Sequence, residues 1–88
     1  MGVVAVQEPD WNEVEHRMLD LTLKQLKPVK RLFNGCLGGA SSKRETVHTM
    51  VNQMRYWWRH VEGDMGKIRV RKVLKSLAEV EGENVGQV

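Results

Sequence analysis

The segment from Ser42 to Gly63 carries the strongest helical pattern in the chain. Its apolar residues recur at spacings of three and four, which places them on one face of a helix. These residues are Val47, Met50, Val51, Met54, Trp57, Trp58 and Val61. Ser42 and Glu45 have the spacing of a capping box, and Gly63 ends the pattern. We therefore expect one long amphipathic helix, and the rest of the domain must pack against it.

Two shorter helical patterns precede this segment. The first begins at Asp10, which can accept the free amides of a first turn, and its apolar face contains Trp11, Val14, Met18 and Leu21. The second begins with another capping signature, Thr22 followed by Gln25. Pro28 interrupts this pattern, because proline inside a helix removes a hydrogen bond and clashes with the preceding turn. Either the helix starts near Pro28 or a first turn breaks there, and we expect a short helix with a disturbed start.

A further apolar stripe predicts a helix near the C-terminal end. It consists of Val70, Val73, Leu74, Leu77 and Val80. Ile68 and Val70 alternate with basic residues, so a short extended start is the alternative. The predicted fold class is an all-α bundle of about four helices with a central helix-loop-helix. Its domain organisation is a flexible arm over 1–9, a single helical domain over 10–80 and a flexible tail over 81–88.

The length and composition bound the class of protein. Eighty-eight residues make one domain. The lone Cys36 cannot form an internal disulfide, and because the sequence shows no secretory signal we expect a reducing intracellular compartment. No apolar run approaches the length of a membrane span, so we expect no membrane partner.

The charge distribution is more informative than the net charge of +3. Residues 1–21 contain five acids and one base, whereas 22–59 contain eight bases and one acid. Residues 67–75 add five more bases. A basic middle between acidic ends is typical of proteins that bind polyanions. The alternative is a solvated surface on which charges cluster without function.

The loop before the long helix and the start of that helix form the main candidate site. Glycine lets a backbone approach a phosphate, and a helix N-terminus presents free amides with a partial positive charge. The candidate residues here are Gly38, Gly39, Ser41, Ser42, Lys43 and Arg44. One flank of the helix continues the basic surface through Arg44, His48, Arg55 and Arg59. The alternative is that these residues have structural roles alone: serine caps the helix, glycine forms the turn and arginine is a solvent-exposed surface residue.

Two other stretches have competing interpretations. The block Lys67, Arg69, Arg71, Lys72 and Lys75 can be solvated surface, an extension of a DNA footprint or a nuclear-import signal. The stretch "RYWWRH" resembles a base-stacking platform. Trp57 and Trp58 continue the apolar stripe, however, so we expect them in the core and only Tyr56 outside.

The sequence does not favour catalytic or metal chemistry. His48 and His60 are twelve residues apart, His16 is remote, and no pair of cysteines is present, so no structural zinc spacing occurs. Cys36 has no obviously coupled base, and the glycine loop lacks the nucleotide-binding pattern. We predict no catalytic residue, no metal ligand and no cofactor.

The segment "LTLKQLKPVKRLFNGCLGGASSKRETVHTMV" resembles the SAP motif, a helix–extended loop–helix DNA-binding module of nuclear proteins. Leu21 and Leu23 match the apolar start, and Leu26-Lys27 matches the Leu-Lys of the first helix. The loop and the helix opening of the family pattern correspond to Gly38-Gly39 through Lys43-Arg44. The apolar positions of its second helix correspond to Val47, Met50 and Val51. The flanking helices are similar to the four-helix N-terminal domain of PIAS-type SUMO ligases.

The resemblance implies a function in the nucleus, in chromatin and transcription regulation. It implies binding of double-stranded, often A·T-rich DNA through the loop and the N-terminus of the second helix, with Lys27 and Arg31 as flanking contacts. We expect a monomeric, non-catalytic DNA-binding module. The alternatives are a protein-protein interaction module that grips a partner helix or an acidic peptide, and a module that binds RNA.

Overall fold

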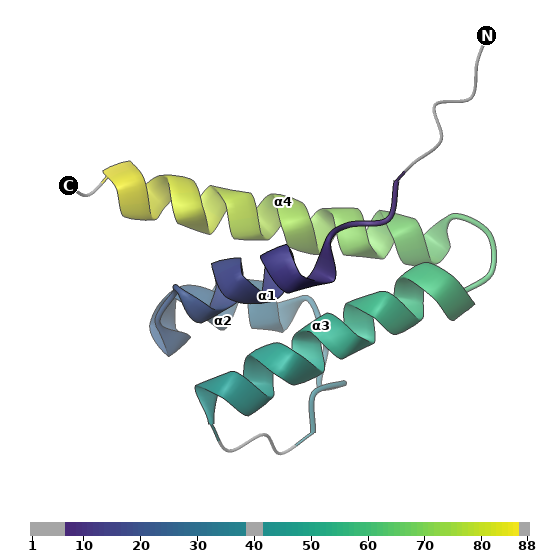
Figure 1. Cartoon of the computed structure of the whole chain (residues 1–88), viewed down its shortest axis with the longest axis horizontal. Coiled ribbons are helices and arrows are strands. Elements are labelled where there is room, and N and C mark those ends of the chain that lie inside the picture. The colour runs from purple at the N-terminus through teal and green to yellow at the C-terminus, as the bar shows by residue number, and fades with distance from the viewer. Residues whose placement is uncertain (1–6, 39–41, 87–88) are drawn as a thin grey trace, which may run out of the picture.

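The computed structural model describes residues 7–38 and 42–86, and this part of the chain folds into four α-helices (Figure 1). The helices are α1 (Trp11–Leu19), α2 (Leu23–Arg31), α3 (Lys43–His60) and α4 (Met65–Gly86). The described residues form no strand, so the predicted all-α bundle is confirmed. Helices α3 and α4 diverge from the connection at 61–64, while α1 packs against α3 and α2 packs against α4.

Three predicted helix starts are present. Asp10 accepts hydrogen bonds from the amides of Asn12 and Glu13 at the start of α1. Thr22 and Gln25 form the complete capping box of α2. The Ser42 hydroxyl oxygen accepts the amide of Glu45 at 3.1 Å. Each cap satisfies an amide that the helix itself leaves unpaired.

The predicted disturbance at Pro28 is wrong. Helix α2 runs without a break through Pro28 from its cap at Thr22 to Arg31. Proline lacks an amide hydrogen, so the Lys24 carbonyl loses its ordinary partner four residues on. Pro28 and Lys24 are both exposed, and water can bind a carbonyl on that face. The cap and the buried Leu26 and Val29 therefore hold the helix together across the proline.

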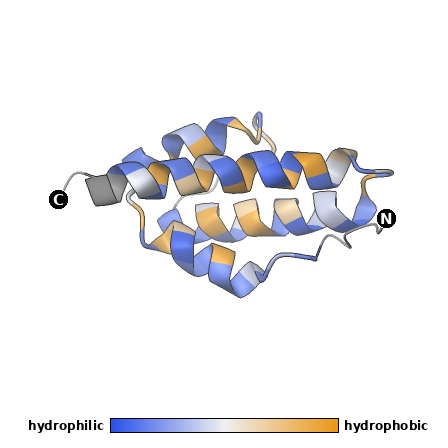
Figure 2. Cartoon of the chain, turned by 90° about the horizontal axis from the view of Figure 1, so that it is seen from above, coloured by the Kyte–Doolittle hydropathy of each residue, from blue (hydrophilic) through white to orange (hydrophobic). Residues whose placement is uncertain are grey.

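The core is a single apolar cluster to which all four helices contribute (Figure 2). Its fully buried side chains include Met18 of α1, Leu26 of α2, Met50 of α3 and Leu77 of α4. Figure 2 shows hydrophobic and hydrophilic segments alternating along the helices, as expected for amphipathic helices that bury one face. The stripe predicted for α3 is buried from Val47 through Trp57, with Trp58 and Val61 half-buried at its end.

Trp57 of α3 packs against both an aromatic ring and a guanidinium group. The Phe33 ring stacks on the Trp57 ring, with ring centroids 5.1 Å apart and an interplanar angle of 25°. The Arg69 guanidinium of α4 lies 4.4 Å from the Trp57 ring centroid. The core position predicted for Trp57 is confirmed, and Tyr56 is exposed as predicted. The Lys67 ammonium lies 5.6 Å from the centroid of the half-buried Trp58 ring.

The connection between α3 and α4 is tight. Gly63 adopts a positive φ of 65°, a conformation that disfavours other residues. Gly66, in the first turn of α4, is buried against the end of α3. A Cβ atom at position 66 would overlap the Trp57 carbonyl oxygen and lie 2.9 Å from the Cβ of Val61. The backbones of the two helices are therefore in direct contact here.

An ion pair joins the first helix to the last. Arg17 of α1 donates three hydrogen bonds to the Glu81 carboxylate of α4, at 2.6 to 3.2 Å. This contact holds the pKa of Glu81 below and the pKa of Arg17 above their usual values. Helix α4 extends to Gly86, so it continues past the tail boundary predicted at residue 81. None of the helices in the described ranges is long and apolar enough to cross a membrane.

Candidate nucleic-acid interface

Helix α2 presents a row of three cations on its outer face. Lys24, Lys27 and Arg31 lie at relative positions 0, 3 and 7, which share one side of a helix, and all three are exposed. Helix α2 contains no acid, and Lys30 adds a half-buried cation beside the row. Among the described residues, none of these four side chains forms an ion pair or a hydrogen bond. We call Lys24, Lys27 and Arg31 the α2 row.

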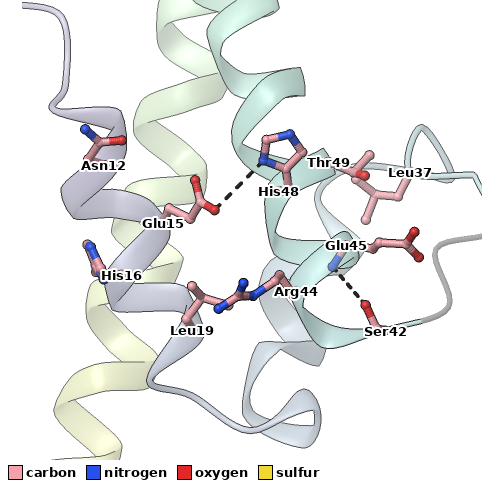
Figure 3. A pocket seen from close by; sticks show the side chains of 10 residues that line it. All are labelled: Asn12, Glu15, His16, Leu19, Leu37, Ser42, Arg44, Glu45, His48 and Thr49. Atoms are coloured by element: carbon pink, nitrogen blue, oxygen red, sulfur yellow. Dashed lines mark hydrogen bonds and ion pairs between the residues drawn. The ribbon is translucent and has the colours of Figure 1, made fainter.

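The basic flank predicted for α3 lies beside α1. Arg44 and His48 point from α3 toward α1 (Figure 3). His48 Nδ1 is 3.9 Å from the Glu15 carboxylate, and Arg59 Nη2 is 2.7 Å from Glu8. Glu8 therefore partly neutralises this flank at Arg59, whereas no ion pair among the described residues neutralises the α2 row.

Arg44 lines a groove of about 870 Å³ at the start of α3 (Figure 3). The charged and titratable residues of the groove are Glu15, His16, Arg44, Glu45 and His48. Arg44 is exposed and has no ion pair among the described residues. The groove contains both acidic and basic side chains. Arg44 is always protonated, whereas histidines titrate near neutral pH, so Arg44 is the groove residue best suited to bind an anion.

Lys43 makes contacts inside the fold. Its ammonium nitrogen donates hydrogen bonds to the backbone carbonyls of Leu19 at 2.6 Å and Leu21 at 3.0 Å. These carbonyls lie at and just beyond the C-terminus of α1, where a helix leaves acceptors unpaired and favours a positive charge. Lys43 thus links the start of α3 to the end of α1 through hydrogen bonds. Its ammonium group is occupied by these contacts, so it is not part of the interface proposed below.

Replacing Lys43 and Arg44 separately should give different results. We expect Lys43→Met to lower the free energy of unfolding by about 1–2 kcal/mol, because two carbonyls lose a charged donor. Arg44→Met should change it by less than about 0.5 kcal/mol, as is usual for exposed side chains without partners. Urea unfolding of the two variants measures both values. Equal stabilities would show that the Lys43 contacts contribute nothing.

The remaining loop residues are only partly described. Ser42 is the N-cap of α3, and Gly38 has a positive φ of 63°. The predicted contacts Gly39 and Ser41 lie outside the described residues. The Ser42 hydroxyl oxygen accepts the Glu45 amide, so helix capping explains the serine at this position without a ligand.

The second basic block lies along α4. Arg69 and Lys67 cover the tryptophan rings described above. Arg71, Lys72 and Lys75 are exposed and, within the described part of the chain, have no ion pair. The block therefore divides into two cations that pack on the core and three that face solvent.

Two features of the surface were missed at the level of sequence. Lys24 extends Lys27 and Arg31 into a row, and its helical spacing was a usable signal. The contact of Glu8 with Arg59 had no such signal, since the two residues are 51 positions apart in sequence. Comparisons of the chain with protein-family models, with curated proteins and with solved structures find no match.

Proposed function

We propose that this protein is a non-catalytic nucleic-acid-binding module that binds the backbone phosphates of double-stranded DNA. The α2 row forms the centre of the interface, with Arg44 at the start of α3 as an additional contact. The observation that carries the proposal is the α2 row itself, which consists of three exposed cations on a helix without any acid. The likeness of 21–51 to the SAP motif supports DNA as the partner.

The spacing of the α2 row suits a phosphate backbone. Seven residues of α-helix span about 10 Å, and successive nucleotides of one DNA strand rise about 3.4 Å along the duplex axis. The row therefore extends over about three nucleotide steps. Cations held in this way bind phosphates through counterion release and recognise little sequence.

The test compares two triple variants that carry equal net charge. One variant is Lys24→Gln, Lys27→Gln, Arg31→Gln, and the control is Arg71→Gln, Lys72→Gln, Lys75→Gln on α4. We expect the α2 variant to bind a short duplex roughly tenfold or more weakly than wild type. The slope of log binding constant against log salt concentration is negative, and it should become shallower by about 2.7, or about 0.9 for each of the three lost phosphate contacts. The control should lose much less affinity, since the proposed interface does not include these three residues.

Three outcomes would contradict parts of this proposal. Equal losses in both variants would show that the total charge, rather than the α2 row, determines the affinity. Absence of binding to duplex DNA by wild type at low salt would exclude the function itself. Stronger binding to RNA in a direct competition would replace DNA as the partner.

A further inference from the structure

The Glu8 carboxylate accepts three hydrogen bonds from two side chains. One of its oxygens, Oε2, accepts hydrogen bonds from Trp11 Nε1 at 2.6 Å, Arg59 Nε at 3.0 Å and Arg59 Nη2 at 2.7 Å. Trp11 belongs to α1 and Arg59 to the last turn of α3, so the donors come from two different helices. Three N–H groups that converge on one oxygen form a binding site for an oxyanion.

The surroundings of this oxygen extend the site. A hollow of about 380 Å³ is lined by Glu8, Arg55 and Arg59 together with Pro9 through Asn12. Arg55 lies one helical turn before Arg59 on the same flank and is exposed. The Trp11 hydrogen bond and the nearby arginines hold the pKa of Glu8 below its usual value. The other acid in the hollow, Asp10, accepts the first amides of α1.

We propose that Trp11, Arg55 and Arg59 form a phosphate-binding site that Glu8 occupies as an internal competitor. The inference rests on the proposed function in one respect, namely that DNA supplies the phosphate. A phosphate oxygen can accept the same three hydrogen bonds, and its other oxygens can reach Arg55. Binding of DNA here displaces the Glu8 side chain. Glu8, in the segment before α1, therefore lowers the affinity of the α3 flank for DNA.

The size of the effect follows from the exposure of the contact. The side chains of Arg59 and Glu8 are 50% and 34% exposed, and ion pairs at such sites are weak. Removing a competitor of that strength raises the apparent affinity by about 2- to 5-fold, because the occupied fraction of the site becomes free.

The test uses the full chain with Glu8→Gln. Glutamine keeps an oxygen for the Trp11 N–H and removes the negative charge. The matched control is Glu79→Gln, which makes the same charge change at an exposed residue with no ion pair among the described residues. We expect Glu8→Gln to bind duplex DNA about 2- to 5-fold more tightly than the control. The gain should disappear in Glu8→Gln combined with Arg59→Gln.

A second measurement does not depend on DNA. Inorganic pyrophosphate should shift the Arg59 Nε–Hε NMR signal saturably, and at a lower concentration in Glu8→Gln than in Glu79→Gln. That result supports the phosphate site even if the wild-type chain fails to bind DNA, in which case the proposed function falls and the site remains. Equal DNA affinities of the two variants, with an Arg59 signal that pyrophosphate leaves unmoved, would overturn the inference.

Discussion

Gly66→Ala is expected to lower the free energy of unfolding by about 3 kcal/mol, at the upper end of the usual cost of overpacking. The added methyl group would overlap the Trp57 carbonyl oxygen, and it would lie 2.7 Å from the Trp57 carbonyl carbon. The obstructing atoms belong to the backbone of α3, so no change of side-chain rotamer relieves the contact. Helices α3 and α4 must separate instead. Thermal unfolding followed by circular dichroism should show a clearly lower midpoint.

The control lies on the same helix. Gly82 is exposed, and a Cβ atom there would meet nothing within 4 Å. Gly82→Ala should therefore raise the stability by about 0.5–1 kcal/mol, because alanine loses less backbone entropy in a helix than glycine does. The same substitution thus has opposite signs at two positions of α4. A stable Gly66→Ala protein would show that the two helices do not approach as closely as described.

Phe33→Ala is expected to cost about 3–5 kcal/mol, the usual range for truncating a fully buried phenylalanine. Phe33 is 0% exposed and stacks on Trp57, which is itself covered by Arg69. Its removal leaves a cavity beside the Trp57 ring. Urea unfolding monitored by tryptophan fluorescence measures the loss, since the Trp57 environment changes directly.

The matched aromatic control for Phe33 is Tyr56. Its side chain is 56% exposed, and its ring lies 5.0 Å from the His60 ring, measured between centroids. We expect Tyr56→Ala to change the free energy of unfolding by about 0.5 kcal/mol or less. If both alanine variants lost the same stability, the stack on Trp57 would not be the source of the Phe33 effect.

The local features of the fold were predictable from the sequence. Helix caps such as Thr22 with Gln25 depend on neighbours three residues apart, so a linear pattern contains them. The buried face of α3 follows from spacing alone, and Trp57 lies where that spacing places it. Pro28 misled the prediction because propensity describes an isolated helix, whereas the burial of Leu26 and Val29 stabilises α2 from outside.

The candidate site was less predictable, because its charges are modified by distant parts of the chain. Lys43 looked like a phosphate contact, yet its partners are the carbonyls of Leu19 and Leu21, more than twenty residues earlier. Arg59 likewise meets Glu8 only after α1 has packed on α3. A helical wheel shows which side a cation faces, but the tertiary fold determines whether an acid faces it.

The short connection between α3 and α4 also has a consequence for the order of folding. Because residues 61–64 join the two helices, the contact of Gly66 with Trp57 closes a loop of only a few residues. Little chain entropy is lost in that step, which favours early formation of the hairpin. The Arg17–Glu81 pair closes a loop of more than sixty residues, so we expect it to form later. We therefore expect the hairpin of α3 and α4 to form first and α1 and α2 to assemble onto it.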